Sequence, residues 1–146
     1  MSVDAAQARA RFVTATVARL ATVGSTGRPH LVPVTFALLD DVTLVTAVDH
    51  KPKRTTALQR LANIAAEPRV SVLVDHYEDD WEKLWWARAD GLARVQGGRT
   101  SKSAALVEAL CARYAQYRVR PPGGPFIVIE VQRFSGWSAA YSAASD

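Results

Sequence analysis

The chain has 146 residues, of which 49% are hydrophobic and 22% are charged. That length corresponds to one domain, 1–146, and this composition excludes an intrinsically disordered chain. The formal net charge is +4, but Lys and Arg are spread along the sequence, which argues against a nucleic-acid-binding surface. A single cysteine, Cys111, excludes an internal disulfide bond.

The first third of the chain predicts a helix and then a β-hairpin. Residues 4–14 have apolar side chains at helical spacing. The expected buried side of this helix consists of Ala5, Ala8, Phe12 and Val13. Two strands, 17–23 and 30–38, follow, and the glycines and proline of 24–29 mark the turn between them. Pro33 lies inside the second strand. Because proline cannot donate to a strand ladder, we expect it at an edge, at a bulge or beside a ligand.

A third strand, 42–48, leads into a helix and a fourth strand, 70–75. Thr55 or Thr56 is the expected N-cap of this helix, since a hydroxyl accepts a hydrogen bond from a free N–H of the first turn. Glu67-Pro68 ends the helix, because the residue before proline disfavours helical geometry. The expected buried face consists of Leu58, Leu61, Ala62 and Ala65.

The second half of the chain predicts two more strands and one more helix. A long strand covers 84–95, and Gly91 within it marks a bulge or a close approach of another backbone. A helix capped by Thr100 or Ser101 follows. Its apolar stripe consists of Val107, Leu110, Cys111 and Tyr114. Residues 126–134 form the last strand.

The sequence therefore predicts six strands and two or three helices, followed by a small, polar tail, 135–146. Consecutive strands without crossover helices are typical of an antiparallel sheet. Such a sheet must close on itself or pack on another layer. The expected fold class is mainly β with flanking helices, in the form of a small, partly open barrel.

A basic segment stands between the third strand and its following helix. Lys51, Lys53 and Arg54 precede the free N–H groups and the positive dipole end of that helix. Together these groups favour a bound phosphate or carboxylate of a cofactor. The alternative is a solvated basic loop, which is common before helices.

Other chemistry is weakly indicated. The three histidines are scattered, without cysteine or carboxylate at metal-ligand spacing, so we expect no metal. A Walker pattern and a glycine-rich dinucleotide motif are both absent.

Thr35 and Thr46 lie on neighbouring strands and can bind a polar ring edge. Trp85 and Trp86 are adjacent on one strand, so they point to opposite faces and one of them faces a partner, a ligand or a second layer.

Several segments together resemble a known family. They are H-L-V-P-V-T-F (30–36), V-T-A-V-D-H-K-P-K (45–53), L-Q-R-L-A-N-I-A-A-E-P-R-V-S-V-L-V-D (58–75) and D-W-E-K-L-W-W-A-R-A-D-G (80–91). The order of these segments is similar to the flavin/deazaflavin oxidoreductase superfamily, the split β-barrel, FMN-binding fold related to pyridoxamine 5'-phosphate oxidase. Within it, the chain resembles the actinobacterial branch of coenzyme F420-dependent enzymes. The resemblance covers roughly residues 12–137.

The resemblance implies a homodimer with two cofactor sites at the subunit interface. It places Val32, Pro33 and Thr35 beside the deazaflavin ring and Val45 and Thr46 at the polar edge of the ring. It also implies that basic residues hold the phosphate and the acidic tail. The residues implied for that role are Lys51 and Lys53, with Thr55 at the helix start. Trp85 or Trp86 of the other subunit, and Trp137, are implied as covers of the pocket.

The leading hypothesis is an F420-dependent oxidoreductase that transfers a hydride to a small unsaturated or electrophilic substrate. The alternatives are an FMN-dependent oxidase or reductase of the same fold and a non-catalytic cofactor-binding protein. We expect no nucleic-acid partner. The N-terminal segment has no apolar core of the signal-peptide kind, and no run approaches the roughly 20 apolar residues of a membrane span. We therefore expect a cytoplasmic protein without a membrane partner.

Overall fold

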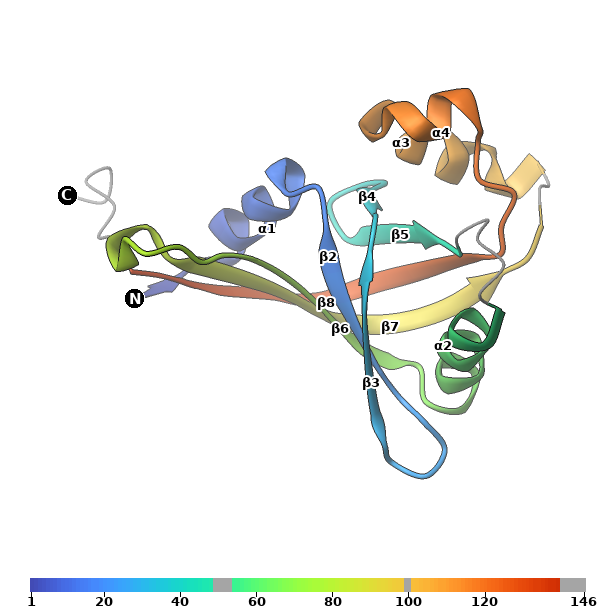
Figure 1. Ribbon diagram of the computed structural model, residues 1–146, viewed down its shortest axis with the longest axis horizontal. Coiled ribbons are helices and arrows are strands. Elements are labelled where there is room, and N and C mark those ends of the chain that lie inside the picture. The colour runs from blue at the N-terminus through green and yellow to red at the C-terminus, as the bar shows by residue number, and fades with distance from the viewer. Residues whose placement is uncertain (49–53, 99–100, 140–146) are drawn as a thin grey trace.

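The computed structural model describes residues 1–48, 54–98 and 101–139, and of residues 54–58 it describes the backbone (Figure 1). The strands are β1 (Ser2–Val3), β2 (Ala18–Val23), β3 (Pro29–Val34), β4 (Ala37–Leu38), β5 (Thr43–Ala47), β6 (Arg69–His76), β7 (Trp85–Gln96) and β8 (Phe126–Ser138). The helices are α1 (Ala5–Thr14), α2 (Arg54–Ala66), α3 (Ala104–Arg113) and α4 (Ala115–Val119), and single 3-10 turns are η1 (Trp81–Lys83) and η2 (Ser101–Ser103). None of the described helices is long and apolar enough to cross a membrane.

All strands among the described residues belong to one antiparallel sheet in the order β3-β2-β6-β7-β8-β5-β4, and β1 pairs with β8. The long strands β7 and β8 form its centre (Figure 1). The end strands β3 and β4 do not pair with each other, but only Thr35 and Phe36 separate them in the chain. The sheet is therefore curled and open along one side. This half-barrel, mostly antiparallel β with flanking helices, confirms the predicted fold class.

The main core lies on the face of the sheet that α1 and α2 cover. Alternate residues of β2, β6 and β7 point into it, as the period of a strand requires. Phe12 of α1 is fully buried there and makes edge-on contacts with Phe36 and Phe134, at centroid distances of 5.8 and 5.6 Å. The opposite face of the sheet, hereafter the outer face, carries Leu31 and Trp86.

The first helix begins where the sequence predicts. Asp4 caps α1, and its carboxylate and the Gln7 side chain form a reciprocal capping box. Only Ala8 and Phe12 of the predicted buried side are buried, whereas Ala5 and Val13 are exposed. The predicted buried side of α1 included too many residues, because the helix contacts the sheet only along one stripe of residues spaced i, i+4.

The predicted strand 30–38 is two strands, which corrects the sequence prediction. β3 ends at Val34 and pairs with β2, whereas β4 pairs with β5 at the other end of the sheet. Phe36, between them, donates its N–H to the Tyr114 hydroxyl instead of a neighbouring strand. Pro33 lies on β3, which is an edge strand, as the missing N–H of proline predicts.

The sheet centre confirms one prediction and corrects another. The register of β7 and β8 shifts at Asp90/Gly91, so Gly91 marks a bulge as expected. The last strand runs to Ser138 and not only to residue 134. The first residues of the predicted tail are therefore sheet, because β1 and β7 pair with them on the two sides of β8.

The helices differ from prediction in their ends and faces. α2 begins at Arg54, so Thr55 and Thr56 lie within its first turn and neither is the N-cap. Within the part of α2 whose side chains are described, residues 59–66, Asn63 and Ile64 are buried, while Ala62 and Ala65 are exposed; the side chain of Leu58 lies outside the described residues. The exposed pair corrects the predicted face, which was derived from apolar residues alone and so passed over a buried asparagine.

α3 also departs from its predicted stripe. It begins at Ala104, after η2, and buries Leu106 and Leu110, whereas Val107, Cys111 and Tyr114 are only half-buried. With α4 it covers a second, smaller core that includes Val45 and Phe126. Thr100 lies outside the described residues.

Candidate cofactor site

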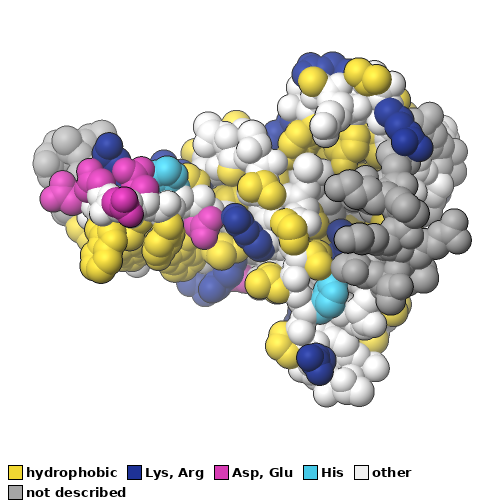
Figure 2. All heavy atoms as spheres, viewed as in Figure 1, with side chains coloured by type: hydrophobic (Ala, Val, Ile, Leu, Met, Phe, Trp, Pro, Cys, Tyr) yellow, Lys and Arg dark blue, Asp and Glu magenta, His cyan; other side chains and the backbone are white. Residues whose placement is uncertain are grey.

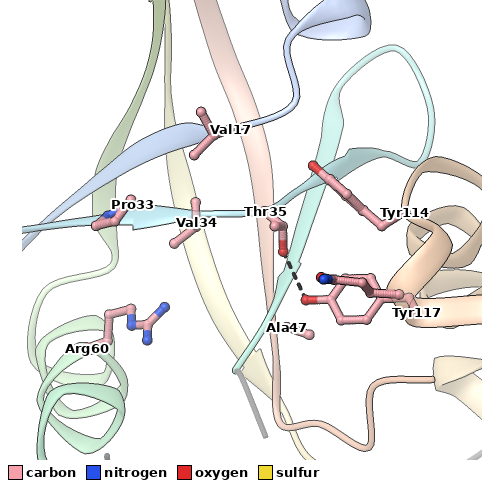
Figure 3. Close-up of a pocket in the computed structure, with 9 residues that line it drawn as sticks. Val17, Pro33, Val34, Thr35, Ala47, Arg60, Tyr114 and Tyr117 are labelled. Carbon is pink, nitrogen blue, oxygen red and sulfur yellow. Dashed lines mark hydrogen bonds between the residues drawn. The ribbon is translucent and has the colours of Figure 1, made fainter. Parts of the chain in front are cut away.

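A cavity of about 320 Å³ lies where the chain leaves β3 (Figure 3). It sits at the open side of the half-barrel, between β3, α2 and the α3–α4 pair. The residues that line it are Val17, Pro33, Val34, Thr35, Ala47, Arg60, Tyr114, Gln116 and Tyr117. Its volume falls at the small end of the range for ligand pockets, roughly 300–1,000 Å³, which suits a ring system more than a whole dinucleotide.

Thr35 is held in the cavity wall from two sides. Its hydroxyl lies 2.9 Å from the hydroxyl of Tyr117, and either oxygen can be the donor (Figure 3). Its carbonyl accepts a 2.6 Å hydrogen bond from the hydroxyl of Thr46, which is buried on β5. These two contacts connect the break between β3 and β4 to α4 and to β5. The polar part of the wall is therefore fixed in place.

Tyr114 binds the backbone at the same break. Its hydroxyl accepts from the Phe36 N–H at 3.0 Å and lies 2.9 Å from the Phe36 carbonyl and 3.0 Å from the Thr16 carbonyl, either of which can accept its proton. Burial raises the pKa of the Tyr114 phenol above its usual value, with a smaller opposing effect from the hydrogen bond to Phe36. Tyr114 is therefore a neutral donor that holds the cavity wall.

Arg113 completes this attachment. Its guanidinium donates to the carbonyls of Phe36 and Val13, at 3.0 and 3.3 Å, and also to the carbonyl of Ala15. It also lies 4.6 Å from the centroid of the Phe36 ring, within cation–π range. Arg113 and Tyr114 thus fasten the end of α3 to the end of α1 and to the β3–β4 break. Sequence reasoning missed this role of both residues.

Arg60 supplies positive charge to the cavity from α2, and its guanidinium points inward (Figure 3). The position of α2 is set by buried polar contacts one turn further on. Asn63 donates from Nδ2 to the Thr22 hydroxyl at 3.0 Å and accepts from Gln59 at 2.7 Å. Since Asn63 and Thr22 are almost fully buried, losing either partner would leave an unpaired polar group. The network therefore orients the helix that carries Arg60.

The predicted ring-binding residues are only partly brought together. Pro33 and Thr35 line the cavity, and Thr46 contacts Thr35. Val32 packs against the main core, and Val45 is buried in the smaller core beneath α3. Lys51 and Lys53, which carry the predicted anion site, lie outside the described residues, as does the side chain of Thr55.

The two adjacent tryptophans point to opposite faces, as the strand period predicts. Trp85 packs against the main core, below the Arg11 guanidinium at 4.5 Å and stacked on His76 at 6.3 Å. Trp86 lies on the outer face beside Leu73 and Arg88. Neither ring lines the cavity within one chain. Trp137 pairs with Trp86 in the sheet register and shares its face.

Three acidic residues, Glu78, Asp79 and Asp80, form a turn between β6 and η1. This acidic turn lies at the far end of the sheet from α4 (Figure 1). Asp80 caps η1 through the Glu82 N–H, and Glu78 contacts His76 and lies 3.9 Å from Lys83. Hydrophobic side chains reach the surface beside these acidic residues (Figure 2). Within one chain, this turn has no contact with the cavity described above.

Sequence analysis missed three of the groups that line the cavity: Arg60, Tyr114 and Tyr117. The only local signal was Y-A-Q-Y (114–117), which puts two tyrosines three residues apart. Among the described residues, no group of three His, Cys, Asp or Glu side chains could hold a metal ion. The lining of the cavity suits a flat, anionic ligand. It offers apolar side chains to a ring, two hydroxyls to a polar edge of the ring, and one guanidinium to a negatively charged group. These residues fit a flavin-type ring.

The solved structures with this fold include several cofactor-binding proteins. A FAD-binding protein from Mesorhizobium loti matches with a TM-score of 0.69 and 22% identity, over 93% of this chain and 95% of that chain. A FAD-binding protein from Mycobacterium smegmatis matches with a TM-score of 0.65 and 18% identity, over 97% and 100%. A heme-binding protein from Mycobacterium smegmatis matches with a TM-score of 0.69 and 24% identity, over 94% of this chain and 55% of that chain.

At these identities the structural matches establish the fold alone. No curated protein matches the sequence. The family model described as pyridoxamine 5'-phosphate oxidase matches residues 5–138, which is nearly the whole chain. The chain therefore belongs to the pyridoxamine 5'-phosphate oxidase family of flavin-binding split barrels.

Proposed function

We propose that this protein is an oxidoreductase that binds a deazaflavin, coenzyme F420, in the cavity at the end of β3. The observation that carries the proposal is the lining of that cavity. An apolar wall of Pro33 and Val34 stands beside the hydroxyls of Thr35 and Tyr117, with Arg60 supplying positive charge. That combination suits a planar ring with a polar edge and an anionic substituent.

The basic residues at the start of α2 favour the deazaflavin over other flavins. Lys51 and Lys53 precede α2 in the sequence, and Arg54 is its first residue; the same helix carries Arg60. F420 has an acidic oligoglutamate tail in addition to its phosphate, so it needs more cations than FMN. Because helix N-termini and nearby ammonium groups attract anions, this segment is suited to that tail.

When bound, F420 would supply a hydride to a small electrophilic substrate. The protein's own contribution is binding and orientation. Pro33 and Val34 would exclude water from one side of the ring, and Thr35 would orient its polar edge. Arg60 would hold the anionic substituent. No nucleophilic side chain is needed for such chemistry.

An FMN-dependent enzyme is the second candidate. The FAD-binding proteins that share this fold support a flavin-type cofactor without choosing among flavins. FMN has a single phosphate, which Arg60 and one lysine could hold. A non-catalytic cofactor carrier is the third candidate, and a heme-binding protein of the same fold supports it.

We further propose that the protein is a homodimer that buries the outer face of the sheet. Leu31 is 67% exposed there, and Trp86 is half-buried beside the Arg19–Asp75 and Arg88–Asp90 ion pairs. Pairs of opposite charge next to apolar side chains suit a self-complementary contact about a two-fold axis. Pro33 pairs with Arg19 on this face and also lines the cavity. A second subunit packed there would lie beside the cavity.

The cofactor is tested by titrating the protein with F420 and, in parallel, with FMN, while following tryptophan fluorescence. We expect micromolar or tighter binding of F420, weakened at least tenfold by Lys53→Ala and by Arg60→Met. Lys102→Ala, at an exposed position of η2, is the matched control and should bind as the wild type does. Preference for FMN would support the second candidate. Absence of binding to both would contradict the proposal.

The dimer is tested by light scattering after size-exclusion chromatography. Leu31→Glu should produce a monomer, because a buried unpaired carboxylate opposes association. Val13→Glu is the control, since Val13 is 54% exposed on α1, away from the outer face. A wild-type monomer at micromolar concentration would refute the dimer and leave the cofactor proposal standing.

A further inference from the structure

The short helix α4 forms one wall of the cavity and is only lightly packed. Gln116 and Tyr117 line the cavity from this helix. None of its five residues is buried, and Val119 at its end is 88% exposed. Tyr117 packs against the edge of the smaller core and is half-buried. Moving α4 away from the cavity would therefore uncover the Tyr117 ring and little other apolar surface.

The chain is fixed on both sides of α4. Tyr114, directly before it, binds the backbone of Thr16 and Phe36 through its hydroxyl. The extended backbone of Tyr114, with φ −123° and ψ 119°, separates α4 from α3. Pro122, shortly after α4, is buried. Tyr114 and Pro122 are thus two fixed points, and the segment between them can detach without disturbing the sheet.

Three contacts of Tyr117 hold α4 in place. Its ring packs edge-on against Tyr114, at a centroid distance of 5.6 Å, and its carbonyl accepts from Cys111 Sγ at 3.2 Å. Both of these contacts stay within the α3–α4 pair. The third joins the Tyr117 and Thr35 hydroxyls, 2.9 Å apart (Figure 3). Among the described residues, this is the one hydrogen bond from an α4 side chain across the cavity to the β3–β4 break.

The other walls of the cavity are held more firmly. Pro33 and Val34 belong to β3, which pairs with β2 along its whole length. Arg60 belongs to α2, and the buried hydrogen bond between Asn63 and Thr22 fixes that helix on the sheet. Elements with few buried contacts open at the lowest free-energy cost. Of the walls that these residues form, α4 is therefore the one that moves most readily.

Resting on the proposed function, we infer that α4 is a lid that opens to admit the cofactor ring, and that the hydrogen bond between Tyr117 and Thr35 is its latch. The cavity volume of about 320 Å³ lies at the lower limit for ligand pockets. A ring system that fills such a cavity needs a wall that retreats while it enters. The latch can form again over the bound ring, because the Thr35 hydroxyl can accept from Tyr117 while its own proton points to the ring.

The first test measures amide hydrogen exchange of the free protein by NMR, where the exchange rate reports the opening equilibrium. The N–H groups of Arg118 and Arg120 donate to the carbonyls of Tyr114 and Gln116, at 3.3 and 3.0 Å. Because a released helix of five residues is unstable in water, opening exposes these amides. We expect them to exchange faster than the amide of Leu110, which is buried on α3.

Removing the latch should accelerate this exchange. The net worth of one hydrogen bond between neutral groups corresponds to roughly a two- to tenfold change in an equilibrium constant. Tyr117→Phe should therefore speed exchange at Arg118 and Arg120 by roughly that factor and leave Leu110 unchanged. The matched control is Tyr77→Phe, which removes a phenol hydroxyl from a side chain that is 65% exposed and should change none of these rates.

A second variant removes the same hydrogen bond from the opposite side. Thr35→Val leaves α4 itself unchanged and should speed exchange at Arg118 and Arg120 as much as Tyr117→Phe does. The double variant should exchange no faster than either single variant, because only one hydrogen bond is lost. Accelerations that multiply in the double variant, or unchanged exchange in both single variants, would overturn the latch.

The third test follows F420 binding by stopped-flow fluorescence. If the cofactor enters only the open state, the association rate constant rises with the fraction of open protein. Tyr117→Phe should therefore raise the association rate constant roughly two- to tenfold, and Tyr77→Phe should not. A residue that only contacts the bound cofactor would instead raise the dissociation rate constant and leave association unchanged.

The outcomes separate this inference from the proposed function. If α4 exchanges as slowly as Leu110 in the wild type, or if loss of the latch leaves the association rate constant unchanged, the lid is refuted and the cofactor proposal stands. If the wild type binds no F420, the proposed function fails, and the exchange of α4 alone decides whether a latched lid exists.

Discussion

Gly91 occupies the bulge between the two central strands, and replacing it by alanine is the most direct test of the sheet geometry. A Cβ at this position would lie 2.2 Å from the Glu130 carbonyl oxygen and 3.0 Å from the Val131 Cα. Both neighbours are backbone atoms of β8, so relief requires separation of β7 from β8. Overpacking of this kind costs roughly 1–3 kcal/mol, and each ladder hydrogen bond that weakens adds about 1 kcal/mol.

One effect opposes this cost. Alanine restricts the unfolded chain more than glycine does, and this stabilises the folded state relative to the unfolded chain by about 0.4–1 kcal/mol. The net expectation for Gly91→Ala is a loss of about 2–3 kcal/mol. With a urea m-value of roughly 1–3 kcal/mol/M for a small domain, the unfolding midpoint falls by on the order of 1 M.

Gly97→Ala is the matched control for this experiment. A Cβ at Gly97 would meet no atom within 4 Å, and this glycine lies just beyond the end of β7. Urea unfolding of both variants, followed by tryptophan fluorescence, gives the comparison. We expect Gly97→Ala to match or slightly exceed the wild type. Free energies of unfolding of the two variants within about 0.5 kcal/mol of each other would show that the close approach of β8 does not constrain Gly91.

Three further predictions concern the core and the cavity wall. Phe12→Ala should destabilise by about 3–5 kcal/mol in urea unfolding, because Phe12 is fully buried against two other rings; a loss below 1 kcal/mol would argue against this core. Arg113→Met should lower the free energy of unfolding, measured by thermal unfolding, by about 2 kcal/mol, since three carbonyls lose a charged donor. Arg120 is exposed, so Arg120→Met is the control and should leave the free energy of unfolding unchanged. Burial raises the pKa of Tyr114, so above about pH 10 only the unfolded state loses that proton and wild-type stability falls with rising pH. Tyr114→Phe should have a flatter stability curve in this range, and parallel curves would contradict the assigned burial.

Part of the candidate site was predictable because it depends on local chemistry. Pro33 lacks a backbone donor, which restricts it to an edge strand wherever that strand lies, and Thr35 follows two residues later on the same segment. Both line the cavity. Arg60 and Tyr117 were not predictable in the same way. An arginine on a helix and a tyrosine near a helix end are ordinary surface residues until the fold places them at one cavity.

The sequence by itself determined the local elements. Apolar segments separated by turn residues located most of the strands, apolar spacing over residues 4–14 located α1, and Gly91 marked the bulge. Each of these features depends on neighbours within a few residues, where side-chain direction and backbone hydrogen bonding are set by local geometry.

Only the tertiary structure decided how those elements meet. The strand 30–38 looks continuous in sequence, yet it divides at Thr35 and Phe36 because its two halves pair with opposite ends of the sheet. The hydrogen bond between Thr35 and Tyr117 joins residues 82 positions apart, and the bond from Asn63 to Thr22 joins residues 41 apart. Such contacts become favourable only after the sheet has curled and the intervening chain entropy has been lost, so no local pattern encodes them.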